Sequence, residues 1–88
     1  MTIENQIKRL ERKIKRITGI METLVKSMSH YAKNAEILLS RKGSQDFHGA
    51  FMSIAEVERL AVSYKKHQHD IDVLHKKISE LRSFLEAA

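Results

Sequence analysis

"IENQIKRLERKIKRITGIMETLVKSMSHYAKNAEIL", residues 3–38, decides the fold of this chain. Its apolar residues recur in alternating steps of four and three, which keeps them in one stripe along a helix. Such a long seam is typical of a helix that packs lengthwise against another helix, and Ile37 and Leu39 widen the stripe toward its end. The stripe consists of Ile3, Ile7, Leu10, Ile14, Ile17, Met21, Leu24, Met28, Tyr31, Ala35 and Leu38.

The composition also favours long helices. The 88 residues include no proline, tryptophan or cysteine and only three glycines, so the usual materials of sheets, sharp loops, disulfides and zinc knuckles are missing. A chain of this length forms one domain at most and buries only about 60% of the surface that it exposes when unfolded. We therefore expect an all-α domain that associates with a copy of itself or with a partner.

The stretch "LLSRKGSQD", residues 38–46, is predicted to contain the turn. Gly43 suits the left-handed position after a helix, and Ser44 or Asp46 can cap the next helix. An alternative start for the second helix is Ser53, which has capping-box spacing with Glu56. The earlier start is favoured because apolar residues already recur at helical spacing from residue 47.

The second helix is predicted to change register partway along. Its first stripe is Phe47, Ala50, Ile54, Val57, Ala61 and Tyr64, and its second is Ile71, Leu74, Ile78, Leu81 and Leu85. The jump between the two stripes adds a three-residue step, which overwinds a coiled coil or lets a helix bend. In an antiparallel hairpin this break lies opposite Gly19, so we expect slackened packing in the middle of the hairpin.

Together these patterns predict one domain over residues 1–88, an antiparallel, coiled-coil-like two-helix hairpin. The helices cover about 3–41 and 46–86, and the turn covers about 42–45. Two helices cannot cover both of their broadened stripes with each other, so we expect a homodimer in the form of a four-helix bundle. The expected oligomer contacts are Ile14, Ile17, Met21, Leu24, Ile54, Val57, Ile71, Leu74, Ile78 and Leu81.

Three histidines lie in "YKKHQHDIDVLH", residues 64–75. His67 and His69 point about 200° apart on a helix, so they cannot share one metal ion, and a zinc site would need ligands from elsewhere. A pH-sensitive association through His67 and His75 is a second reading. The favoured interpretation is a solvated stretch that covers the register break, with no metal bound.

Positive charge is concentrated in "KRLERKIKR", residues 8–16, which carries a local net charge of +5, equal to that of the whole chain. This stretch is either a solubilising coat or a site for an anionic partner such as a phospholipid surface or an acidic protein. Nucleic acid is disfavoured because no aromatic residue interleaves the basic ones. The outward-facing candidates for anionic-surface binding are Lys8, Arg9, Arg12, Lys15 and Arg16.

Several functional classes find no support in the sequence. The chain has no cysteine nucleophile, no glycine-rich phosphate loop and no serine, histidine and acid at suggestive spacing, so we expect no enzyme and no cofactor. Residues 1–13 lack the continuous apolar core of a signal peptide or a membrane span. We therefore expect a cytoplasmic protein that can bind a membrane peripherally.

Two resemblances sharpen these expectations. "IKRLERKIKRITGIMETLVKSMSHYAKNAE" and "AFMSIAEVERLAVSYKKHQHDIDVLHKKISELRSFL" resemble the first and second helices of sorting-nexin-type BAR domains, in their Leu-Glu and Leu-Val-Lys elements and in "AEVE". That resemblance implies a dimeric helical module whose basic residues meet an anionic membrane.

The size and hairpin layout are also similar to those of WXG-type proteins and type III secretion chaperones. Gly43, Phe47 and Phe51 lie where a WXG-type turn would be, although Arg41 replaces the tryptophan. This second resemblance implies a small secretion-associated hairpin that binds a partner helix. Both resemblances point to a non-enzymatic interaction or scaffold module.

Overall fold

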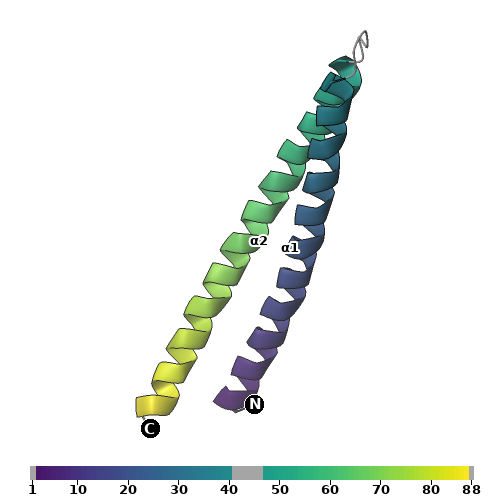
Figure 1. The fold of residues 1–88 in the computed structure, drawn as a ribbon. Coiled ribbons are helices and arrows are strands. Elements are labelled where there is room, and N and C mark those ends of the chain that lie inside the picture. Colours follow the sequence, from purple (N-terminus) through teal and green to yellow (C-terminus); the bar gives the residue numbers. More distant parts are fainter. Residues whose placement is uncertain (1, 41–46, 88) are drawn as a thin grey trace.

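The protein is an antiparallel hairpin of two long α-helices (Figure 1). The computed structural model describes residues 2–40 and 47–87, in which α1 spans Ile3–Ser40 and α2 spans Phe47–Ala87. The helices lie side by side, so the two ends of the chain lie together at one end of a body measuring 71 × 16 × 14 Å. The predicted helical hairpin is confirmed, whereas the predicted turn and the helix ends at 41 and 46 lie outside the described residues.

Local sequence accounts for the start of α1. The Thr2 hydroxyl accepts a hydrogen bond from the Asn5 amide at 3.1 Å, which is the N-cap arrangement that threonine favours. α1 continues through Gly19, which is exposed, with open space where a Cβ would stand. α2 is helical from Phe47 onward, so the earlier of the two predicted starts agrees with the structure and the start at Ser53 is wrong.

The predicted seam of α1 is confirmed in full. All eleven of its residues are buried or half-buried, and Ile7, Met21 and Ala35 are the most enclosed, at 4–7% exposed. Apart from half-buried Gln6 and Ser27, the described residues between them are exposed, because the 3.5-residue period keeps a single stripe against α2. The seam therefore holds the two helices together along their whole length.

The inner face of α2 keeps one register from end to end, so the predicted break after Tyr64 is wrong. Apolar periodicity indicated a break because two inner positions, Ser53 and His67, are polar. In addition, apolar Ile54 lies off the inner face and is 39% exposed. Steps of three and four run unbroken through the inner residues, which are Ala50, Ser53, Val57, Leu60, Tyr64, His67, Ile71, Leu74, Ile78 and Leu81.

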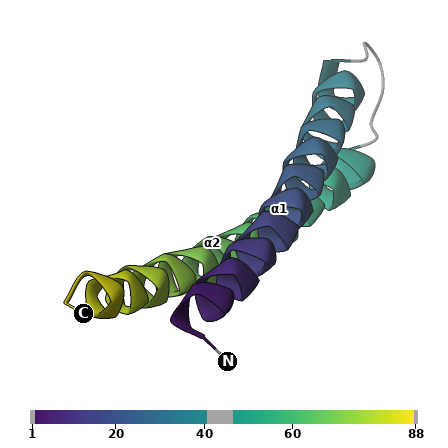
Figure 2. The ribbon, with the colours of Figure 1, turned by 90° about the horizontal axis from the view of Figure 1, so that it is seen from below.

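The size of the inner side chains changes along the hairpin. Near the turn the inner residues Ala35, Ala50 and Ser53 are small and buried, and toward the termini Ile7 and Ile78 take their place. Small side chains let two backbones approach closely. In the view of Figure 1 the helices separate toward the termini. Seen from below, they also cross at an angle rather than lie strictly parallel (Figure 2).

Candidate interaction surfaces

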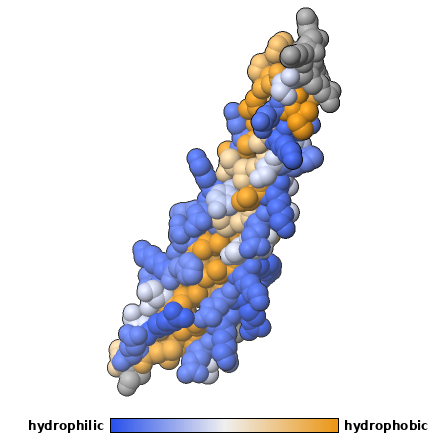
Figure 3. All heavy atoms as spheres, in the orientation of Figure 1, coloured by the Kyte–Doolittle hydropathy of each residue, from blue (hydrophilic) through white to orange (hydrophobic). Residues whose placement is uncertain are grey.

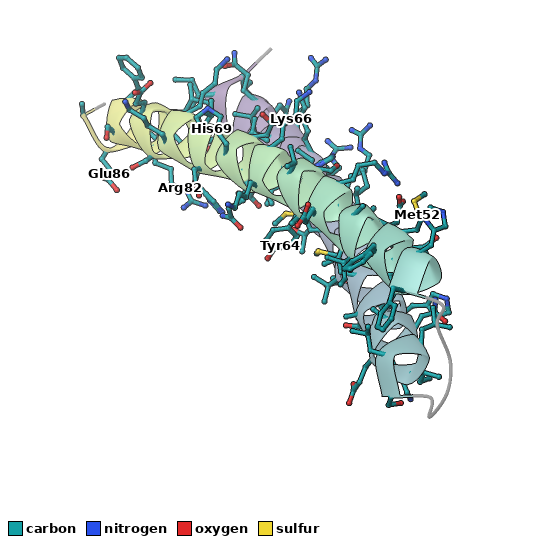
Figure 4. All side chains as sticks on the ribbon, turned by 90° about the horizontal axis from the view of Figure 1, so that it is seen from above. Met52, Tyr64, Lys66, His69, Arg82 and Glu86 are labelled. Atoms are coloured by element: carbon teal, nitrogen blue, oxygen red, sulfur yellow. The ribbon has the colours of Figure 1, made fainter. Side chains whose placement is uncertain are left out.

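Two flanks border the seam, each formed by residues seven apart on both helices. The first flank contains a contact between the helices, in which Arg82 Nη2 lies 3.2 Å from Glu11 Oε1. On α2, Tyr64 and Arg82 project to one side, whereas Lys66 and His69 project to the other (Figure 4). The first flank comprises Glu11, Thr18, Val25, Ala32 and Leu39 of α1 with Phe47, Ile54, Ala61, Gln68, His75 and Arg82 of α2. The second flank comprises Gln6, Lys13, Ile20, Ser27 and Asn34 of α1 with Gly49, Glu56, Ser63, Asp70, Lys77 and Phe84 of α2.

The first flank is apolar in the half of the hairpin near the turn. We call this surface the apolar face, and its members are Val25, Ala32, Leu39, Phe47, Ile54 and Ala61. The four large side chains among them are 39–53% exposed. A space-filling view shows a hydrophobic band between the helices that runs along the hairpin to its turn end (Figure 3). Exposed apolar surface that is continuous across two helices is typical of interaction sites.

The apolar face is hollowed rather than flat. One hollow of about 530 Å³ lies among Ala32, Leu39, Ile54 and Val57. The next, of about 580 Å³, lies beside Val25. Polar and charged side chains of both signs edge the two hollows, namely Glu22, Lys26, Glu36 and Gln68. An apolar centre with a polar rim is the usual composition of a protein interface.

The second flank is polar near the turn. Asn34 Nδ2 donates a 2.9 Å hydrogen bond to the Ser53 hydroxyl, which joins α1 to α2 at a buried position. Arg59 donates hydrogen bonds to the Glu56 carboxylate, and this bonding holds the pKa of Glu56 below its ordinary value and raises the pKa of Arg59. These contacts stabilise the hairpin from within and leave no apolar surface comparable with that of the first flank.

A basic groove opens on the second flank near the termini. It has a volume of about 560 Å³, and half-buried Leu10 and Leu81 form its apolar part. The other residues that line it are Gln6, Arg9, Lys13, Arg16 and Lys77, so four cationic side chains and no acidic one border it.

The five residues predicted to bind an anionic surface are all exposed on α1. Arg9 and Arg16 border the basic groove, and Lys8, Arg12 and Lys15 surround a shallower hollow with Glu11. Arg12 also shares a third hollow with Arg9, Arg16 and Asn5. The sequence-based list omitted Lys13 and Lys77, the two lysines that line the groove from opposite helices. The signal was present, because both lie on flank positions beside the seam, but combining them required the register of α2.

The residues predicted to form oligomer contacts divide into two groups. Ile54 lies on the apolar face, open to a second molecule. The others line the inner faces of α1 and α2 and contact each other within one chain, namely Ile14, Ile17, Met21, Leu24, Val57, Ile71, Leu74, Ile78 and Leu81. Contact of these inner residues with another copy stays a prediction.

The histidines are separated as their spacing predicts. His67 is half-buried at an inner position, and its Nδ1 lies 2.7 Å from the Ser63 carbonyl oxygen, so Nδ1 carries the proton and donates it. His69 and His75 are exposed. The interpretation of all three as a solvated stretch is therefore wrong for His67. Within residues 2–40 and 47–87, no three acidic or histidine side chains come together as a metal site.

Neither helix, over its described residues, is apolar enough along a sufficient length to cross a membrane. The sequence matches no family model, and neither a curated protein nor a solved structure matches it. The resemblances to BAR domains and to secretion-associated hairpins therefore stay predictions.

Proposed function

We propose that this chain is a non-enzymatic helical scaffold that binds a second copy of itself through the apolar face, forming a four-helix bundle. The apolar face is the observation that carries the proposal. Phe47 is 53% exposed there and Leu39 50%, although both are large apolar side chains. Burying such a side chain stabilises an assembly by about 1.5–3 kcal/mol, so leaving several in water is costly.

The hairpin also lacks a second layer. Among the described residues no large side chain is fully buried, because each helix has only one neighbour. Stable helical domains pack two layers around a shared core, and four-helix bundles achieve this with two hairpins. A second hairpin laid on the apolar face would supply the missing layer.

A copy of the same chain suits this face for electrostatic reasons. The apolar face itself carries no charge, and its rim combines Glu22 and Glu36 with Lys26, so a two-fold axis can bring opposite charges of two copies together there. The basic stretch at residues 8–16 would repel its own copy, but it lies in the other half of the hairpin. Pairing near the turn therefore keeps the two basic ends free.

The free basic ends give the scaffold its second role in this proposal, which is docking on an anionic membrane. Lys8, Arg12 and Lys15 are exposed on the outer side of α1, away from the seam. Each basic residue near an anionic surface contributes about 1 kcal/mol to binding. A dimer presents two such surfaces and binds more tightly than one hairpin does.

The hollows of the apolar face favour one alternative, in which the occupant is an amphipathic helix of another protein. Helices dock into apolar grooves through residues at i, i+3, i+4 and i+7. This is the activity expected of a secretion-associated hairpin or chaperone. It requires that the hairpin alone be monomeric.

Paired substitutions on α2 test the proposal. Ile54→Lys places a charge on the apolar face, and Val62→Lys places the same charge at a position that is 70% exposed and lies on neither flank. Light scattering should give twice the chain mass for the wild type and for Val62→Lys, and the single-chain mass for Ile54→Lys. A wild type that is monomeric at micromolar concentration, or an Ile54→Lys variant that remains dimeric, would show the proposal to be wrong.

A further inference from the structure

The basic groove gathers cations from both helices. Arg9, Lys13 and Arg16 reach it from α1, and Lys77 reaches it from α2. The groove lies on the second flank near the termini, whereas the apolar face lies on the first flank near the turn. Its occupancy is therefore independent of whether the apolar face is covered.

None of these four cations forms an ion pair with another of the described residues. The two ion pairs among the described residues, Arg59 with Glu56 and Arg82 with Glu11, involve none of them. Lys13 has basic neighbours at helical spacing, because Arg9 precedes it by four positions and Arg16 follows it by three. Like charges at this spacing destabilise a helix. The free hairpin therefore carries an electrostatic cost that a bound anion would remove.

We propose that the basic groove binds a compact anion bearing two or more phosphate groups. Arginine guanidinium groups donate paired hydrogen bonds that match phosphate oxygens, and lysine ammonium groups act as point charges. Cations that line the groove from two helices suit a ligand whose charges are divided between linked phosphates. Half-buried Leu10 and Leu81 border the site on its apolar side, which keeps part of the ligand out of bulk water and strengthens its charge interactions.

Inorganic tripolyphosphate serves as the probe for this inference. The thermal midpoint of the full chain should rise by several degrees with tripolyphosphate and much less with sodium chloride at equal ionic strength, because a ligand that binds only the folded state stabilises it. Lys77→Gln should weaken tripolyphosphate binding about tenfold or more, the scale of one charge-assisted hydrogen bond. Lys76→Gln is the matched control, because Lys76 is the exposed neighbour of Lys77 and does not line the groove.

A distinctive second result should accompany the loss of binding. Without ligand, Lys77→Gln should melt at or slightly above the wild-type temperature, because it removes a cation from a crowded cluster. Equal effects of Lys76→Gln and Lys77→Gln on binding would overturn the inference, since they would mean diffuse attraction rather than a site. A wild-type midpoint that tripolyphosphate and chloride raise equally would overturn it too.

Vesicles then identify the source of the phosphate groups. The chain is compared on phosphoinositide vesicles and on phosphatidylserine vesicles of equal charge. Stronger binding to the phosphoinositide vesicles, lost in Lys77→Gln, assigns the groove to a lipid headgroup. Tripolyphosphate binding without that preference assigns it to a free polyphosphate, and both results support the groove. This inference rests on the membrane-docking part of the proposed function only for the lipid source. Its failure would leave untouched the docking of Lys8, Arg12 and Lys15 on phosphatidylserine vesicles.

Discussion

The hydrogen bond between Asn34 and Ser53 gives an asymmetric prediction, because its two partners are buried to different degrees. Ser53 is 6% exposed on the inner face of α2, whereas Asn34 is exposed on the flank of α1. Asn34→Ala removes the 2.9 Å donor from a buried hydroxyl, and a neutral hydrogen bond of this kind contributes about 1 kcal/mol. Ser53→Ala leaves Asn34 to bind water, and it replaces serine with the residue that favours a helix most.

The free energy of unfolding should therefore fall by about 1 kcal/mol for Asn34→Ala and change by less than about 0.5 kcal/mol for Ser53→Ala. For a domain of this size, 1 kcal/mol corresponds to about 4–8 °C in the thermal midpoint. The double variant should resemble Ser53→Ala. Once Ser53 is replaced, Asn34 has no hydrogen-bond partner on α2, so replacing it as well should cost little. Thermal melts followed by circular dichroism give the midpoints of the wild type, the two single variants and the double variant. All four are measured at one protein concentration, since self-association makes stability depend on concentration. Additive losses, or a larger loss for Ser53→Ala, would refute this account of the seam.

Substitutions of three other groups of residues give testable predictions. His67→Leu should raise the thermal midpoint by several degrees, because it completes the apolar inner face; an unchanged or lower midpoint would mean that the imidazole stabilises the seam. Arg59→Ala should return the lowered pKa of Glu56 to its ordinary value, which a carboxylate NMR titration measures, and an unchanged pKa would show that the hydrogen bond does not set it. Reversing Arg12 and Lys15 to glutamate should abolish sedimentation with phosphatidylserine vesicles at low salt without lowering helicity, and retained sedimentation would remove these residues from the membrane-docking proposal.

The pKa shift of Glu56 also fixes the direction of one pH dependence. Its carboxyl group has a lower pKa in the folded hairpin than in the unfolded chain, so its contact with Arg59 stabilises the fold above the unfolded pKa. That contribution is lost as the pH falls through the folded pKa. Because both side chains are in contact with solvent, the effect on total stability is small.

The sequence was sufficient for the helices and for the seam of α1, because a strict apolar period specifies one face without knowledge of the partner. It was insufficient for α2, where Ser53 and His67 stand at inner positions and Ile54 stands beside one of them. A stripe of apolar residues two positions wide allows more than one register, and only packing against α1 selects among them.

The composition of the basic groove and of the apolar face could be predicted only once the register of α2 against α1 was known. The basic stretch was visible in the sequence because its residues are contiguous, but the groove required Lys77 to be placed opposite Lys13. Likewise, the apolar face combines Leu39 of α1 with Ile54 of α2. Without the register of the two helices, the oligomer contacts expected from the sequence were mainly residues that pack inside one hairpin. Contacts between distant segments are set by the register of the two helices, which local periodicity does not encode.

The most direct test of the central claim, that a second copy covers the apolar face, is isotope-filtered NOE spectroscopy on an equal mixture of labelled and unlabelled chains. Docking of two hairpins through the apolar face predicts intermolecular NOEs to the methyl groups of Val25, Leu39 and Ile54, and none to Val62, which lies on neither flank. Intermolecular NOEs confined to inner residues such as Leu74 would mean that the chains exchange helices instead of docking as hairpins. The absence of any intermolecular NOE at millimolar concentration would contradict the claim.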